Sequence, residues 1–199
     1  NIIRNLSLSQ SDTEIKQFYL DNFINKGFPN RRDENWKFSD LNQIIKKNIG
    51  ELSFYNDYTS TNKVDTSVFV DGLEHNKIVF INGRIEKIDF DYEKKDKIEI
   101  IDKSETINKF NNNNSLSDLN NAFTNKSFKI LVKNGYQLVK PLIIYHITNS
   151  DIWSKNINLR LDFELGKDSS LRLIDLYNDI SEKNFLNIFY NFDLKENAV

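Results

Sequence analysis

The 199-residue sequence predicts an α+β protein that is mainly β. Apolar residues recur at helical spacing within 12–47 and again after Ser115, whereas from residue 77 onward most alternate with polar residues, as in half-buried strands. From residue 156 the expected strands begin roughly fifteen residues apart, a spacing typical of stacked sheets or a β-solenoid. These patterns divide the chain into a helical region over 1–50, a mixed α/β segment with hairpins over 51–150 and a β-region over 151–199.

The composition argues against several classes of protein. The formal net charge is −2 and the charges are interspersed, whereas nucleic-acid binders usually carry a basic face. With no cysteine and two histidines, the sequence offers no thiolate or histidine-rich metal site. No apolar run approaches the ~18 residues of a membrane span, and the first residues lack the apolar core of a secretory signal. We expect a cytoplasmic or organelle-interior protein.

Two helices are expected in the first fifty residues. Ser11 and Glu14 fit a capping box at the start of a helix over 12–26, which Gly27 and Pro29 end. A shorter helix is expected over 39–47. Its inward residues would be Leu41, Ile44 and Ile45, and Lys46 and Lys47 would favour its C-terminal end.

The middle of the chain combines loops, strands and one helix. Residues 50–67 are polar and predict a linker, and the Asn111–Asn114 tract predicts a flexible loop. Asn82-Gly83 separates two alternating runs over 77–88, the strongest short signal for a type I′ hairpin turn. Further elements are expected as a strand over 96–101, a helix from Ser115, and two strands around Asn134-Gly135, the second entered through Pro141.

The last fifty residues are expected to be β throughout. Apolar residues alternate strictly over 157–165, a turn follows over 166–170, and further strands are expected over 171–176 and 186–194. The last strand has a full apolar face that only "KENAV" follows, which would leave a sticky edge. We therefore expect that the chain is cut within its β-region.

The segment Phe28–Leu41 is the densest charged and aromatic run. Arg31 and Arg32 could form a phosphate clamp, and Asp33 with Glu34 could form an acid/base pair. Adjacent residues do not converge on one substrate atom unless the backbone turns sharply, and arginine forks suit partner carboxylates equally well. A structural or docking role is therefore favoured over chemistry.

The other residues of this segment support that interpretation. Trp36 and Phe38 are expected on one side of an extended stretch, packed against the domain body. Arg32, Glu34 and Lys37 are expected to pair locally or to face a partner. The segment would then be an ordered connector with candidate interaction residues.

No other group predicts an active site. His146 shares a strand face with apolar residues and is expected to be a hydrogen-bonded core or edge histidine, while His75 is expected to be solvated in a polar loop. Asp162 and Glu164 share the strand face opposite the core, where solvated charge is the default. Glycine-rich phosphate loops and the Gly-x-Ser-x-Gly elbow are missing. The sequence therefore predicts no catalytic residue, no cofactor site and no metal ligand.

Four motifs in collinear order carry a family resemblance. The stretch "GFPNRRDENWKFSDL" resembles the N-terminal signature of the SufD branch of the SufB/SufD family, the scaffolds of iron–sulfur cluster assembly. "KIVFINGRI" resembles the family's hairpin, and "SLSDLNNAFTNKSFKILVKNGYQLVKPLIIYHIT" resembles its helix and strand pair. "LGKDSSLRLIDLY" is similar to the turn and strand that open its β-helix, with Asp175 where members often carry Glu. The resemblance covers nearly the whole chain.

The resemblance implies a fold and a role. This chain would correspond to the family's helical N-terminal region, its small α/β segment and the first turns of a right-handed parallel β-helix. It would be a non-catalytic scaffold in iron–sulfur cluster biogenesis, with SufB-like and SufC-like subunits as partners through later parts of the family's chain. The family's cluster-handling residues have no counterpart here, so no catalytic, cofactor-binding or metal residue is carried over. Arg31, Arg32, Glu34, Trp36 and Lys37 remain signature and candidate interaction residues.

A different class of function stays open from the residues alone. The expected strands could form a free-standing β-solenoid or sandwich that binds carbohydrate or protein, with exposed aromatic side chains at Tyr136, Tyr145, Trp153 and Tyr190. A carbohydrate-active β-helix enzyme would need paired acids on one face, for which Asp162 and Glu164 are the candidates.

Overall fold

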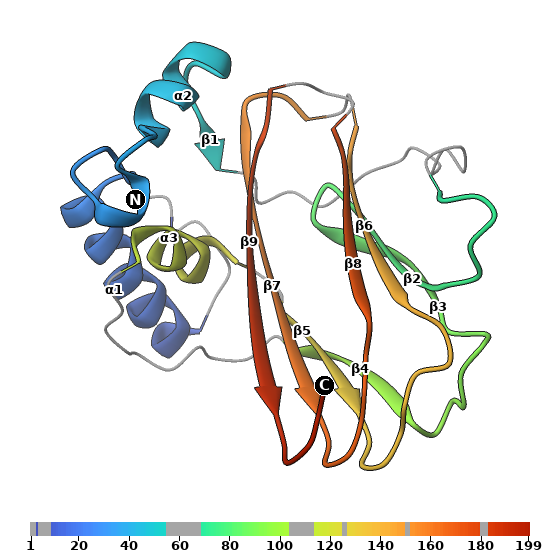
Figure 1. Ribbon diagram of the computed structural model, residues 1–199. Coiled ribbons are helices and arrows are strands. Elements are labelled where there is room, and N and C mark those ends of the chain that lie inside the picture. The colour runs from blue at the N-terminus through green and yellow to red at the C-terminus, as the bar shows by residue number, and fades with distance from the viewer. Residues whose placement is uncertain are drawn as a thin grey trace.

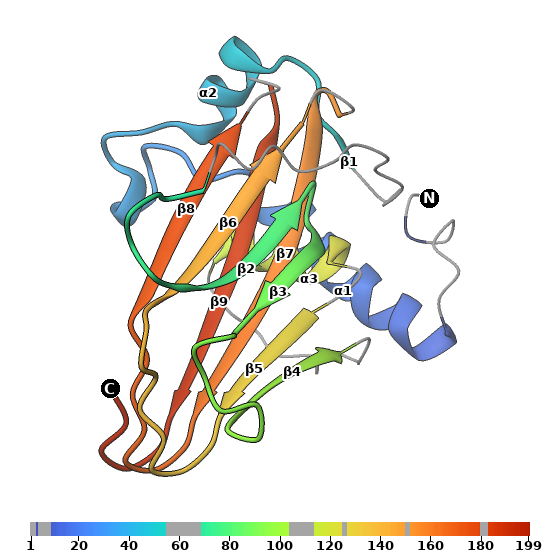
Figure 2. The same ribbon diagram turned by 90° about the vertical axis from the view of Figure 1, so that its right-hand side faces the viewer.

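The computed structural model describes residue 3 and residues 9–54, 69–103, 114–124, 127–149, 152–179 and 183–199. Within these ranges a helical layer lies beside two β-sheets (Figures 1 and 2). The helices are α1 (Gln10–Lys26), the 3-10 helix η2 (Glu34–Trp36), α2 (Leu41–Asn48) and α3 (Ser115–Phe123). The strands are β1 (Ser53–Phe54), β2 (Asn76–Ile81), β3 (Arg84–Asp89), β4 (Ile98–Lys103), β5 (Ser127–Val132), β6 (Leu142–Thr148), β7 (Lys155–Leu165), β8 (Leu173–Asp179) and β9 (Phe185–Leu194). The prediction of a mixed, mainly β protein is confirmed. No helix in these ranges is long and apolar enough to cross a bilayer.

The first helix begins slightly earlier than predicted, because a different serine caps it. The Ser9 side chain accepts a hydrogen bond from the amide of Asp12 at 3.2 Å and donates to its carboxylate at 2.6 Å. The predicted capping box of Ser11 and Glu14 is therefore wrong. At the other end Gly27 has a φ of 72° and its amide donates to the Phe23 carbonyl at 2.7 Å, so the predicted glycine stop is confirmed.

The second helix matches its prediction apart from one inward residue. Asp40 caps α2 by accepting a hydrogen bond from the Gln43 amide at 3.0 Å. Leu41 and Ile45 are buried, but Ile44 is 44% exposed and does not face inward as expected.

The hairpin predicted at Asn82-Gly83 is present. Strands β2 and β3 pair antiparallel, and both turn residues have positive φ, 50° and 80°, as a type I′ turn requires. A methyl group on Gly83 would lie 2.7 Å from Cγ2 of Ile157, so close approach also demands glycine there.

The polar linker predicted over 50–67 contains β1, and its remainder after Phe54 lies outside the described residues. Residues 111–113 lie outside them too, while Asn114 caps α3 through the amide of Leu116.

The strands from β5 onward alternate between two sheets. One sheet has the order β4-β5-β7-β9 with β1 beside the start of β7, and the other has the order β3-β2-β6-β8. Neighbours β5, β7 and β9 are parallel, as are β2, β6 and β8. Ser127 pairs with Arg160 and Asn156 pairs with Phe185, so stacked strands come about 30 residues apart along the chain. The strands around Asn134-Gly135 therefore lie in different sheets, and the only hairpin among the described residues is β2–β3.

Three stacked turns set this arrangement. The turns at 133–138, 166–171 and 195–199 each place one residue in the left-handed conformation, namely Gly135, Asp168 and Asn197, with φ of 69°, 55° and 56°. The Gly135 amide donates to the Lys167 carbonyl at 2.7 Å, and the Asp168 amide donates to the Glu196 carbonyl at 2.9 Å. The side chain of Asn197 also donates to Asp168 at 2.8 Å. Each turn thereby fixes the register of the next.

The largest apolar core fills the space between the sheets. It contains alternating residues from both sheets, including Ile78, Phe80, Phe128, Ile130, Leu142, Ile144, Leu159, Leu161 and Phe163. The outer face of β6 is covered as well, so every residue of this strand is buried. A separate core joins the helices through Tyr19 and Phe23 of α1 and Leu119 and Phe123 of α3.

Helix α3 joins the sheet through a layer of asparagines. The side-chain amide of Asn120, which is fully buried, donates to the carbonyls of Leu159 at 3.0 Å and Asn187 at 2.7 Å. The side chains of Asn158 and Asn187, which pair in register across β7 and β9, hydrogen bond at 2.9 Å. Buried amides need such partners, so this layer fixes the position of α3.

Two lysines join α1 to α3. Lys26 forms a 2.7 Å ion pair with Asp118, whose side chain is fully buried. Lys16 donates to the carbonyls of Ala122 and Thr124 at the end of α3. Burial lowers the pKa of Lys16 to about 8, although Asp12 nearby opposes that shift.

A buried carboxylate anchors the loop between the sheets. Glu93 accepts hydrogen bonds from the side chains of Asn76 and Tyr136, each at 2.7 Å, and from the amides of Val139 at 3.1 Å and Lys140 at 3.0 Å. Burial alone would raise the pKa of Glu93, but these hydrogen bonds lower it below its ordinary 4.5.

We predict that Glu93→Gln lowers the free energy of unfolding at neutral pH by about 1–3 kcal/mol, because an amide oxygen cannot satisfy four donors. A group with a lowered pKa stabilises the fold above its ordinary value and loses this effect as the pH falls through the lowered one. The difference between variant and parent should thus shrink below about pH 4.5. Urea unfolding across pH measures it, and the exposed Glu86→Gln serves as control. An equal effect of both substitutions would contradict the assignment.

We also predict that Asn120→Ala lowers the free energy of unfolding by about 1–3 kcal/mol, since two backbone carbonyls lose their buried donor. Asn35→Ala, at an exposed position, should change it little. Thermal and urea unfolding measure both variants. A stability unchanged by Asn120→Ala would show that the asparagine layer is dispensable.

Candidate functional site

The signature segment forms an ordered, closed loop. The Leu41 amide donates to the Pro29 carbonyl at 3.0 Å, which closes the loop. Within it the Asp33 carboxylate accepts from the Asn30 amide at 2.8 Å. The amide of Trp36 donates to the carbonyl of Asp33 at 2.8 Å, which forms η2 in place of the expected extended stretch.

The charged signature residues face outward. Arg31, Arg32, Glu34 and Lys37 are exposed, and Trp36 is half-buried. Phe38 is 86% exposed, so the prediction that it packs against the body is wrong. The 3-10 turn separates it from Trp36, and its ring instead carries the Lys37 ammonium 5.1 Å from its centroid. The segment therefore presents charge and one aromatic ring outward.

A hollow of about 440 Å³ lies between this loop and the start of α3. Its lining includes Asp33, Glu34 and Trp36, which face Asn114 and Ser115 at the start of α3. Lys26 also lines it but is paired with Asp118. The structure thus brings together the acids and the tryptophan and leaves the arginines apart from them.

His75 is not solvated as predicted. It is 5% exposed; its Nδ1 lies 2.6 Å from the Leu73 carbonyl oxygen and its Nε2 lies 2.8 Å from the Tyr145 hydroxyl. The polar sequence around it does not reveal that Tyr145, seventy residues later, reaches it from β6. Tyr145 is itself 2% exposed, which also corrects its prediction as a surface aromatic residue.

His146 is a buried, hydrogen-bonded residue, as predicted, and it organises a polar cluster. Its Nε2 lies 2.9 Å from the Tyr190 hydroxyl of the opposite sheet and 2.9 Å from Oδ1 of Asp175. The Tyr177 hydroxyl donates to Oδ2 of the same carboxylate. We call His146, Asp175, Tyr177 and Tyr190 the cross-sheet cluster.

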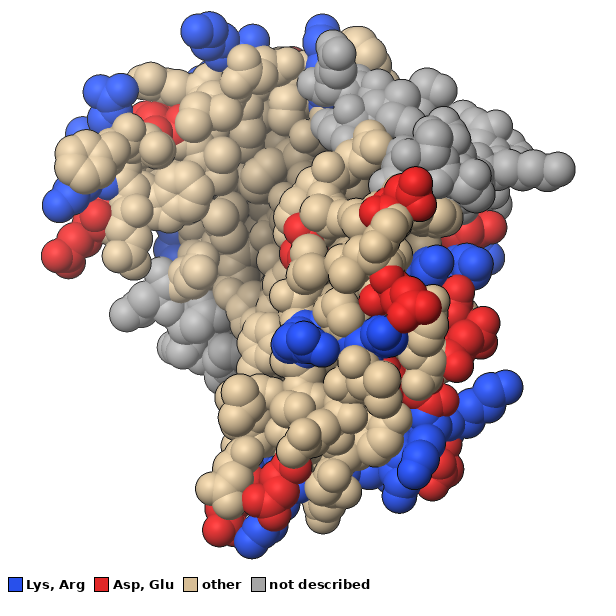
Figure 3. Space-filling view, turned by 45° about the vertical axis from the view of Figure 1, so that its right-hand side comes forward, with Lys and Arg blue, Asp and Glu red and all other residues tan. Residues whose placement is uncertain are grey.

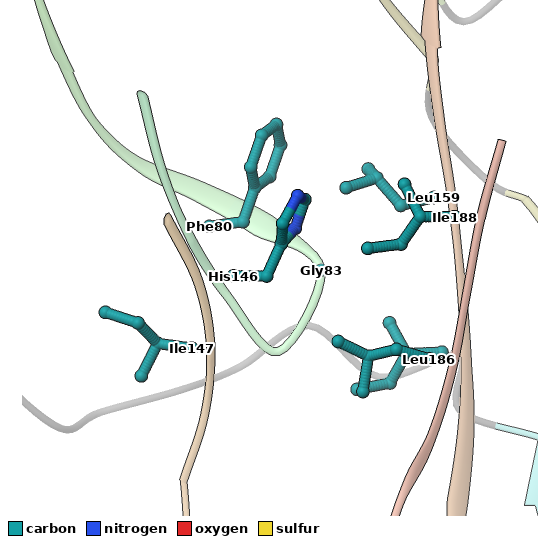
Figure 4. Close-up of a pocket in the computed structure, with 8 residues that line it drawn as sticks. Phe80, Gly83, His146, Ile147, Leu159, Leu186 and Ile188 are labelled. Carbon is teal, nitrogen blue, oxygen red and sulfur yellow. The ribbon is translucent and has the colours of Figure 1, made fainter. Parts of the chain in front are cut away.

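Parallel register produces the cross-sheet cluster. Phe80, His146 and Tyr177 are register partners across β2, β6 and β8, and their rings stack at centroid distances of 5.4 and 5.1 Å. Figure 4 shows Phe80 and His146 beside Leu159 and Ile188, around a cavity of about 10 Å³. The imidazole is thus held in place by rings on both faces.

The cluster shifts the pKa values of its own members. Burial alone would raise the pKa of Asp175, but interactions with His146, Tyr177 and Tyr190 lower it below its ordinary value. Burial raises the pKa of Tyr190 and Tyr177 above the ordinary 10, and the neighbouring Asp175 carboxylate raises both further. At neutral pH the cluster therefore holds one carboxylate and two neutral phenols that can donate hydrogen bonds.

The cluster lies toward the β8 and β9 side of the two-sheet body. Each of these strands pairs with one neighbour among the described residues. Their exposed apolar side chains include Tyr177, Phe192 and Leu194, which are 59%, 50% and 53% exposed. Figure 3 shows a hollowed and largely uncharged strip on one face of the molecule, with many of the charged side chains toward its margins.

The residues proposed for carbohydrate chemistry are not arranged for it. Glu164 pairs with Lys129, and Asp162 pairs with Arg160 at 3.3 Å, so each acid has its own cation. Tyr136 and Tyr190 are half-buried, which leaves Trp153 as the exposed member of the four aromatic residues considered. Among the described residues no group of three or more His, Cys, Asp or Glu could hold a metal ion.

Comparisons with protein-family models and with curated proteins each found no match to this chain.

We predict that Asp175→Asn moves the ionisation of Tyr177 and Tyr190 to lower pH, because the substitution removes the negative charge that opposes it. Ultraviolet absorbance of tyrosinate during alkaline titration measures the shift. Asp162→Asn, on the outer face of β7, should leave the titration unchanged. Identical curves for the two variants would contradict the charge assignment.

Proposed function

We propose that this chain is a SufD-like, non-catalytic scaffold that acts in iron–sulfur cluster assembly with SufB-like and SufC-like subunits. Under this proposal the cluster is handled by the assembled complex, and Arg31, Arg32, Glu34, Trp36 and Lys37 identify the family and offer a docking surface. The SufD-like assignment in this proposal rests on the four sequence motifs that occur in collinear order.

The stacking of β5 to β9 is the observation that carries this proposal furthest. Consecutive strands alternate between two sheets and return in parallel register about 30 residues later, as the successive turns of a solenoid do. The repeated left-handed turn residue supports the same interpretation. We propose that residues from β5 onward are the first turns of a right-handed parallel β-helix, the hand that parallel crossovers nearly always adopt.

The arrangement of the signature segment is consistent with docking. Its charged residues Arg31, Arg32, Glu34 and Lys37 are exposed, and the acids at 33 and 34 separate the two arginines from the lysine, so the exposed charge is of mixed sign. Mixed exposed charge of this kind directs partner orientation more than it adds affinity. The rigid loop closure keeps these side chains in a defined geometry.

The test is co-purification of the complete gene product with SufB-like and SufC-like subunits from the same source. We expect a stable complex that contains all three. A protein that stays monomeric beside both would overturn the proposal. Partner subunits that assemble with each other in the same preparation show that they are competent.

A paired variant tests the signature segment within that complex. Arg31→Ala with Arg32→Ala should lower the association rate several-fold at low salt and less at high salt, because exposed charges act mainly through steering. Lys46→Ala with Lys47→Ala removes the same charge from α2 and serves as control. If both double variants lower the association rate equally, the decrease comes from the change in net charge and not from this surface.

A free-standing module that binds carbohydrate or protein is the second candidate. Trp153 supports it, because its ring is 57% exposed and carries the Lys183 ammonium 4.7 Å from its centroid. Glycan-array binding that Trp153→Ala abolishes would favour this candidate over the scaffold.

A further inference from the structure

The cross-sheet cluster gathers four metal-ligating side chains at one point. We propose that His146, Asp175, Tyr177 and Tyr190 bind a ferric ion. The inference goes beyond the scaffold role and does not rest on it, because it follows from the donor atoms alone.

The separations between the donor atoms fit one coordination sphere. Nε2 of His146 lies 2.9 Å from both the Tyr190 hydroxyl and Oδ1 of Asp175. The Tyr177 hydroxyl donates a hydrogen bond to Oδ2 of Asp175. Metal–ligand bonds of about 2.0–2.2 Å at right angles place neighbouring donors about 3 Å apart. A small outward movement of these side chains therefore accommodates an ion.

The types of donor favour trivalent iron. Carboxylate and phenolate oxygens are hard ligands, imidazole is a common ligand of iron, and tyrosine is an established ligand of ferric haem. When the metal displaces the two phenolic protons to the solvent, the two phenolates and the Asp175 carboxylate supply three negative charges. These charges match a trivalent ion better than a divalent one.

Burial and access also suit a bound ion. The His146 side chain is 2% exposed and its ring is held between Phe80 and Tyr177, so it loses little freedom on binding. Oδ1 of Asp175 is buried, and Nε2 of His146 lies 2.9 Å from it. Tyr177 is 59% exposed and opens the cluster toward solvent. An ion can therefore enter past Tyr177 and reach the Asp175 carboxylate.

The experiment adds ferric nitrilotriacetate to the metal-free full chain. We expect one equivalent of iron to bind and to produce a visible phenolate-to-iron charge-transfer band. Tyr177→Phe and Tyr190→Phe should each weaken or remove this band, and Asp175→Asn should weaken iron binding at least about tenfold. Tyr92→Phe is the matched control, because Tyr92 is a half-exposed tyrosine beside Lys140 and outside the cluster. It should leave the band unchanged.

Three results would overturn the inference. The first is no visible band at excess iron, and the second is a band of equal strength in the Tyr177→Phe, Tyr190→Phe double variant. The third is binding of zinc in preference to iron. Circular dichroism and a cooperative melt establish that each variant is folded. If the double variant does not fold, His146→Gln and Asp175→Asn replace it, and a band unchanged in both overturns the inference.

Discussion

The in-register stacking of parallel strands is the constraint on which the rest of the structure depends. Each turn holds one residue in the left-handed conformation and hydrogen bonds to the turn of the next layer, so the strands on both sides start at matched positions. Because strand side chains alternate between faces, a slip of one residue would exchange the core and solvent faces of a strand. The apolar core, the asparagine layer under α3 and the ring stack at His146 all require that register.

Local chemistry made several elements predictable. Asn82-Gly83 specified a hairpin because both residues tolerate positive φ, and strict alternation specified β7 and β9. The sheet that each strand joins was not predictable. The stacked turns at Gly135, Asp168 and Asn197 send consecutive strands to different sheets, but these residues have no sequence motif in common beyond a tolerance for the left-handed conformation. The cap at Ser9 was missed because Ser11 and Glu14 fit the same pattern two residues later.

The candidate sites were predictable only in part. The sequence indicated that His146 lies inside, from its apolar strand face, but its partners lie on β8 and β9 and meet it through tertiary structure. His75 was misassigned for the same reason, because a polar neighbourhood in sequence does not show which distant residue covers it. Phe38 was misassigned because η2 rotates the backbone where an extended segment was expected.

The stacked turns also bear on how this protein can change in length during evolution. An insertion between Val132 and Leu138, or between Leu165 and Leu171, would disrupt hydrogen bonds to an adjacent turn, so a length change there requires a compensating change in its neighbour. Homologous chains should therefore keep the spacing of their strands at these turns.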